Sequence, residues 1–218
     1  MINLKTKGGQ KLLTAGNWAW SIFTINFAWF LINFSVILTA IILGSINLSV
    51  SFVMINLILT FMLAIFTIPS LMASFKTVQD WQINGNASYF KKQFANWIQM
   101  LKNFKLNVGF AFMFGVLIKL NNKFLEFVFP HMFVLTTTVI VIALLITESF
   151  QIGTNSDESF IELCLDHPVK ILGATAIFIA LLILNLVLQL AFLIVICSIS
   201  LSVYFTYRLF GGRVEKND

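Results

Sequence analysis

Residues 171–207 read ILGATAIFIALLILNLVLQLAFLIVICSISLSVYFTY, and this stretch decides the class of the fold. It contains no charged residue and no proline, and its only glycine is Gly173. At about 1.5 Å per residue, one continuous helix of this length would be roughly twice as long as the hydrocarbon core of a bilayer is thick. The stretch therefore predicts either two membrane spans folded into a hairpin or one over-long helix.

Three further apolar blocks precede it, at residues 18–43, 48–74 and 105–147, and the last is long enough for two passes. The whole chain has the same character, with 11% charged and 59% hydrophobic residues and a mean hydropathy of +0.92. A soluble domain is about 25% charged. We therefore expect an all-α, polytopic integral membrane protein, with residues 1–218 forming a single membrane domain.

Most lysine and arginine residues fall into three clusters: before the first apolar block, between the second and third, and after the last; six spans leave Lys119 and Lys123 outside. Positive residues in short connectors stay on the cytoplasmic side, so an even number of crossings must separate the clusters. This favours six spans in the cytoplasmic membrane with both termini inside. The predicted spans are residues 18–43, 48–74, 106–120, 126–147, 171–188 and 191–207, with cytoplasmic connectors at 75–105 and 148–170. Five spans with an external C-terminus remain the alternative, because no Gly, Pro or Asp marks a turn near residues 188–191.

The first cytoplasmic connector contains an amphipathic pattern that follows a predicted turn at Asn84-Gly85-Asn86. Apolar side chains recur at spacings of 4, 3, 4 and 3, which is one face of a helix: Phe90, Phe94, Trp97, Leu101 and Phe104. Cationic and amide side chains occupy several of the other positions: Lys91, Lys92, Asn96, Gln99, Lys102 and Asn103. Such a helix lies along the lipid headgroups with its lysines toward anionic lipid. An interfacial strut is favoured over a docking helix for a cytoplasmic protein, and the candidate lipid or partner contacts are Lys91, Lys92, Phe94, Trp97 and Lys102.

The second cytoplasmic connector is acidic. Its carboxylates are Glu148, Asp157, Glu158, Glu162 and Asp166, and Ser156 is the predicted start of a short helix that His167-Pro168 ends. Opposite charges on one side of the membrane suggest pairing of Lys91, Lys92 or Lys102 with Asp157, Glu158 or Glu162. Exposed ion pairs are worth only about 0 to 1 kcal/mol, so such contacts would order this face without dominating stability.

Polar side chains inside the spans are candidates for function or for contacts between helices. They form a candidate intramembrane polar seam: Asn26, Asn33, Asn56, Asn185 and Gln189. Interhelical hydrogen bonding is favoured over a substrate path. No Asp, Glu, Lys or Arg lies in mid-span, which argues against a proton-coupled pump. Small residues four apart predict close helix packing at Ser70 and Ser74, Ala111 and Gly115, and Ala176 and Ala180.

The sequence contains few side chains of the kinds that enzymes use for catalysis or for binding metals. His131 and His167 are the only histidines, and no His, Cys, Asp or Glu cluster has metal-ligand spacing. We therefore predict no catalytic residue, no cofactor and no metal. The net charge of +5 does not indicate nucleic-acid binding, because the cationic residues sit where membrane topology requires them.

Two patches of the chain resemble the YesL family of bacterial membrane proteins. The first comprises residues 68–75 (IPSLMASF), Trp81, Tyr89-Phe90-Lys91, Phe94 and residues 102–105 (KNFK), and the second is the His167-Pro168 step before the last apolar run. The chain departs from the family pattern in lacking a proline or glycine break within that last run.

The resemblance implies a family of unknown molecular activity that is associated with carbohydrate uptake in Gram-positive bacteria. We therefore expect an accessory or regulatory protein that assists a sugar ABC importer or a membrane sensor. The alternative is a small facilitator for a sugar or another polar solute. The accessory role is favoured because a sugar site needs several convergent polar groups, and the spans supply few.

Overall fold

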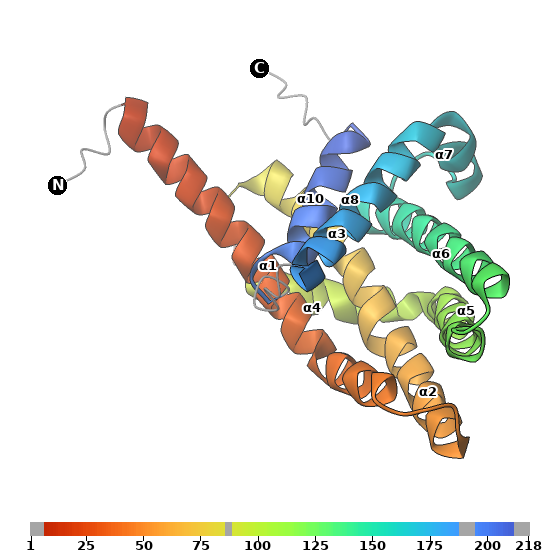
Figure 1. Ribbon diagram of the computed structural model, residues 1–218. Coiled ribbons are helices and arrows are strands. Elements are labelled where there is room, and N and C mark those ends of the chain that lie inside the picture. The colour runs from red at the N-terminus through yellow and green to blue at the C-terminus, as the bar shows by residue number, and fades with distance from the viewer. Residues whose placement is uncertain (1–6, 86–88, 188–194, 212–218) are drawn as a thin grey trace.

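The computed structural model describes residues 7–85, 89–187 and 195–211, and within these residues the chain is helical without a strand (Figure 1). The elements are α1 (Lys7–Gly44), α2 (Val50–Met62), the π-helical turn η1 (Leu63–Thr67), α3 (Ile68–Asn84), α4 (Tyr89–Met100), the 3₁₀ turn η2 (Leu101–Asn103), α5 (Phe104–Lys123), α6 (Val128–Thr154), α7 (Phe160–Asp166), α8 (Pro168–Val187) and α10 (Ser198–Leu209). In this part of the chain, five helical segments are long and apolar enough to cross a membrane: Gln10–Gly44, Val50–Asn84, Tyr89–Lys123, Val128–Thr154 and Pro168–Asn185. The predicted class of a helical, multi-pass membrane protein is confirmed.

The last apolar run is not one helix. Asn185 of α8 donates a hydrogen bond to the Ser198 hydroxyl of α10 at 2.8 Å. In a continuous helix, residues thirteen positions apart would be separated by about 20 Å. The two helices are therefore separate and pack on each other, which excludes the over-long helix, although α10 has only 12 residues. The predicted turn and Gln189 lie outside the described residues.

The second span continues farther than predicted. Residues 75–84, expected in a connector, prolong α3 because the first helix breaker is Gly85, whose φ of 69° favours glycine. This places a turn where Asn84-Gly85 predicts one.

Two glycines set the closest helix contacts. A Cβ added to Gly115 of α5 would overlap the Thr60 hydroxyl of α2, as the predicted packing at Ala111 and Gly115 requires. A Cβ on Gly153 of α6 would lie 2.6 Å from the Met72 carbonyl oxygen of α3. The predicted close packing at Ala176 and Ala180 is wrong, because both side chains are exposed.

The short helix of the second connector begins three residues later than predicted. Ser159, and not Ser156, is its N-cap, and Ser159 and Glu162 form a capping box. The S-x-x-E sequence at residues 159–162 predicts this N-terminus, because in a capping box the side chain of each residue accepts from the backbone N–H of the other.

The ends of α3 and α10 meet beside the first half of α1. The Tyr204 ring of α10 lies 5.8 Å from the Trp18 ring of α1 and 5.3 Å from the Trp81 ring of α3. Arg208 donates to the Gln82 side chain at 2.8 Å. The first turns of α1 project beyond this contact (Figure 1). We call this end of the molecule, which carries Lys76, Lys92 and Arg208, the basic end.

Candidate functional site

A polar interface joins α3 to α4 at the basic end of the molecule. The buried side of α4 consists of Tyr89, Gln93, Asn96 and Met100, which recur at helical spacing. It faces the small residues of α3, which leave room for amide side chains.

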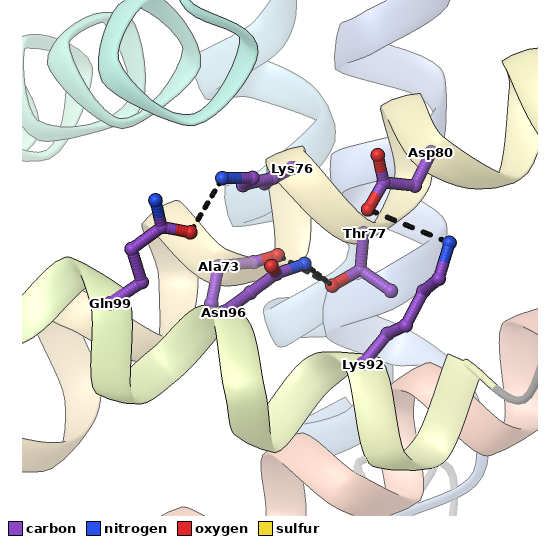
Figure 2. A network of polar contacts seen from close by, with 7 residues as sticks. All are labelled: Ala73, Lys76, Thr77, Asp80, Lys92, Asn96 and Gln99. Carbon is purple, nitrogen blue, oxygen red and sulfur yellow. Dashed lines mark hydrogen bonds and ion pairs between the residues drawn. The ribbon is translucent and has the colours of Figure 1, made fainter.

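Two amides connect these helices. Gln93 donates to the Ser70 carbonyl at 3.1 Å and to the Ser74 hydroxyl at 2.9 Å. Asn96 donates to the Thr77 hydroxyl at 3.0 Å, which in turn donates to the Ala73 carbonyl at 2.8 Å (Figure 2). The sequence-based placement of Asn96 with the outward polar residues is therefore wrong, since an amide is more stable against another helix than against lipid.

Lysines close the edges of this interface. Lys76 donates to the side-chain oxygen of Gln99 at 2.6 Å, and the Lys92 ammonium lies 3.9 Å from an Asp80 oxygen (Figure 2). Within the described residues, the structure does not contain the predicted pairs of Lys91, Lys92 or Lys102 with Asp157, Glu158 or Glu162. Lys92 pairs with Asp80 of the neighbouring helix. The α7 side packs on α6 and α8 instead, and Glu158 lies 3.6 Å from His167.

Trp97 supplies a hydrogen-bond donor that Pro69 cannot provide in the second apolar helix. Pro69 has no N–H, so the Ile65 carbonyl four residues earlier loses its ordinary helical donor. The indole N–H of Trp97 donates to that oxygen at 2.9 Å, and the indole stacks on Phe66 at 5.9 Å. The π-helical turn η1 lies at this place, as such turns do where a helix is locally interrupted.

The five candidate lipid or partner contacts, four in α4 and Lys102 in η2, thus lie in different environments. Lys91 and Lys102 are exposed, and Lys92 is half-buried beside Asp80. Phe94 is half-buried next to Phe90, whose ring stacks on Phe27 of α1, and Trp97 points to η1. Only the two exposed lysines are fully available to lipid or a partner.

The predicted polar seam is divided into separate interhelical contacts. Asn33 of α1 donates to the Ser70 hydroxyl at 2.9 Å and accepts from the Thr67 hydroxyl at 2.6 Å, which links α1 to the α3–α4 interface. Asn56 of α2 donates to the Gly115 carbonyl of α5 at 2.9 Å. Asn185 bonds Ser198, as described above.

Asn26 bonds the segment that begins α10, whereas Asn33 bonds α3, although the two asparagines share one face of α1. Its side-chain oxygen accepts from the backbone N–H groups of Ile199 and Ser200, both at 3.0 Å, and its amide donates to the Val195 carbonyl at 2.8 Å. Asn26 therefore caps the beginning of α10 from a neighbouring helix.

Titratable groups outside the spans show two clear shifts. The backbone N–H of Ser159 lowers the pKa of Glu162 by hydrogen bonding its carboxylate. Burial raises the pKa of the Cys164 thiol, with a smaller contribution from the charge of Glu148. A raised thiol pKa disfavours the nucleophilic thiolate.

Comparison with known proteins gives no match to a family model, a curated protein or a solved structure. The resemblance to the YesL family therefore stays a prediction. The sequence analysis missed Gln93 as the centre of the α3–α4 interface. Gln93 lies three residues before Asn96 and therefore on the same face of the helix, and this spacing was the available sequence signal.

Proposed function

We propose that this protein is an accessory or regulatory component of a carbohydrate uptake system, located in the cytoplasmic membrane. It crosses the membrane six times with both termini inside, and it acts on a sugar ABC importer or an associated membrane sensor through α4 and α7. The carbohydrate context rests on the resemblance of residues 68–105 to the YesL family. The accessory role rests on the use that the spans make of their polar side chains.

The observation that carries the proposal is the hydrogen bonding of the four asparagines of the predicted polar seam, all of which the structure describes. Each of them donates to a group outside its own helix: Asn26 to Val195, Asn33 to Ser70, Asn56 to Gly115 and Asn185 to Ser198. A transport path for a sugar needs several polar groups that converge on the solute. Asparagine side chains that already bond neighbouring helices favour a fixed scaffold over a transport path for a solute.

The basic end of the molecule offers surfaces of opposite charge. The exposed Lys91 belongs to a helix held rigidly on α3, while α7 exposes Glu162 and Asp166. Complementary charges of this kind favour selectivity and fast encounter with a partner more than affinity.

Co-purification from native membranes in mild detergent tests the proposal. We expect permease or ATPase subunits of an importer to be recovered with the wild-type chain and to be reduced with Lys91→Glu. Lys123→Glu is the matched control, because Lys123 is in the last turn of α5, away from α4. Sugar flux through liposomes that contain this chain alone, without recovery of such subunits, would contradict the accessory role and support the facilitator.

A further inference from the structure

A polar pocket of about 370 Å³ opens beside the α3–α4 interface, between Lys76 of α3, the η2 turn and the end of α6. Two lysines and four amides supply its polar lining: Lys76, Lys102, Gln99, Asn103, Gln151 and Asn155. Three segments that are distant in sequence therefore converge on one space. Its volume is within the usual range of small-molecule sites, about 300 to 1,000 Å³.

The lining carries positive charge without a compensating carboxylate. Lys76 is half-buried and Lys102 is exposed, and no Asp or Glu is among the residues that line the pocket. The nearest acidic residue in sequence, Asp157, follows the lining residue Ser156 but is itself exposed outside the pocket. Such a site favours an anion.

A hydrogen bond between two lining residues, Lys76 and Gln99, fixes the position of their donor groups. The side-chain oxygen Oε1 of Gln99 accepts from the Lys76 ammonium at 2.6 Å, which holds the lysine in place and leaves the N–H groups of the Gln99 side-chain amide as donors (Figure 2). Lysine and amide N–H groups are suitable donors to phosphate oxygens.

The α6 side of the pocket is also fixed by the backbone. Asn155 adopts a left-handed conformation with a φ of 48°, which asparagine tolerates better than most residues. The N–H groups of Asn155 and Ser156 both bond the Gln151 carbonyl, at 3.1 Å for Ser156. This turn carries the Asn155 side chain to the pocket lining.

We propose that this pocket binds the phosphate group of a phosphate ester. Lys76 and Lys102 neutralise the phosphate, and the amides of Gln99, Asn103 and Gln151 donate to its oxygens. The pocket is larger than a phosphate alone, so an attached glycerol or sugar fits as well. The same chemistry is offered by the headgroup of phosphatidylglycerol and by a soluble phosphate ester. The inference goes beyond the accessory role and does not depend on it, because it requires no protein partner.

Binding to the full chain in nanodiscs tests the proposal. The lipid arm measures, by native mass spectrometry, the retention of phosphatidylglycerol supplied in a phosphatidylcholine bilayer. The soluble arm titrates glycerol 3-phosphate and inorganic phosphate into nanodiscs of phosphatidylcholine alone and follows thermal protection. We expect saturable binding in at least one arm, about tenfold weaker in Lys102→Gln and in Lys76→Gln, since each variant loses a charge-assisted contact.

Lys11→Gln is the matched control, because Lys11 is an exposed lysine of α1 that does not line the pocket. It should bind as the wild type does. Retention of phosphatidylglycerol alone identifies the lipid as the source, and protection by the soluble probes alone identifies a free phosphate ester. Absence of binding in both arms overturns the proposal. Equal weakening by Lys11→Gln and Lys102→Gln also overturns it, since this would indicate general surface electrostatics. If the half-buried Lys76 is needed for folding, Lys102→Gln and Asn103→Ala still decide the result.

Discussion

Asn26 is the residue on which the placement of α10 most depends. The first N–H groups of a helix have no partner within that helix, and Cys197 at the N-cap position makes no side-chain hydrogen bond. Asn26 accepts from two of these N–H groups, and the Ser200 hydroxyl donates to the Ile22 carbonyl at 2.8 Å nearby. In a low-dielectric interior these contacts have no water to replace them.

Replacement of Asn26 by leucine should therefore destabilise the protein. We expect Asn26→Leu to lower the free energy of unfolding by about 1 to 3 kcal/mol, because buried N–H groups lose their acceptor. Thr24→Val is the control, since the Thr24 hydroxyl bonds only carbonyls of α1, and it should change stability by less than about 0.5 kcal/mol. Thermal unfolding in detergent measures both, and equal effects would show that Asn26 does not fasten α10.

Gly115 provides a second test at the scale of single residues. Gly115→Ala should cost about 1 to 3 kcal/mol, because the new methyl group overlaps the Thr60 hydroxyl. Thr60→Ala removes that hydroxyl and should restore most of the lost stability in the double variant. Gly109→Ala, whose Cβ would meet nothing within 4 Å, is the control. If the double variant Gly115→Ala/Thr60→Ala is no more stable than Gly115→Ala alone, the Thr60 hydroxyl is not the group that the new methyl group overlaps.

The sequence predicted which asparagines lie in the spans but not their partners. Asn26 and Asn33 occupy one face of α1, yet one bonds α10 and the other bonds α3. Helical spacing defines a face, whereas the neighbour of each turn depends on how the helices are arranged in space.

At the scale of the element, α4 shows why amphipathic patterns are ambiguous in a membrane protein. The sequence predicted the helix and its two faces, but the exposure of the side chains does not follow the two faces. Gln93 is 0% exposed and Asn96 8%, whereas the amide of Gln99 is exposed. The aromatic residues Phe94 and Trp97 are half-buried. Amides within a membrane need partners on another helix, so helical spacing alone does not show which polar side chains are buried.

This difference predicts which α4 contacts stabilise the hairpin with α3. Gln93→Leu should lower the free energy of unfolding by about 1 to 3 kcal/mol, because it removes two buried hydrogen bonds. Asp80→Asn breaks only the half-exposed pair with Lys92 and should cost less than about 1 kcal/mol. Denaturant titration of the two variants compares them, and a larger effect of Asp80→Asn would reverse the assignment.

The capping box of α7 gives a pH dependence with a definite sign. The pKa of Glu162 is lowered in the folded state, so its stabilising effect is present above the ordinary value of 4.5 and is lost as the pH falls through the lower folded pKa. Ser159→Ala should remove the side-chain cap of α7 and the smaller, hydroxyl part of the pKa shift, while the backbone N–H of this position still bonds the Glu162 carboxylate. Hydrogen exchange of residues 160–166 should then be faster at neutral pH, and carboxylate titration by NMR should move the pKa of Glu162 only part of the way toward its ordinary value. A complete return of the pKa to that value would show that the backbone N–H does not hold the carboxylate.

At the scale of the whole molecule, composition sufficed to predict the class, and charge distribution predicted which segments share an end. The contact between Arg208 and Gln82 agrees with that distribution. The separation of α8 from α10 was less predictable, because residues 171–207 contain no breaker after Gly173. It depends on the tertiary contacts of Asn26 and Asn185, which no local pattern reveals.

Cysteine labelling tests the arrangement of the whole chain. In a background of Cys164→Ser and Cys197→Ser, single cysteines replace Gln10, Leu209, Asn47 or Leu125, all of which are exposed. We expect Gln10→Cys and Leu209→Cys to react with a membrane-impermeant maleimide only after the cells are permeabilised, because Lys11 and Arg208, which lie next to them, belong to cationic clusters that stay on the cytoplasmic side. Asn47→Cys and Leu125→Cys, in the connectors of the opposite end, should react in intact cells. If Leu209→Cys reacts from outside while Gln10→Cys does not, the chain crosses five times. Arg208 could then not reach Gln82, so the six-span arrangement and the shared basic end would both be lost.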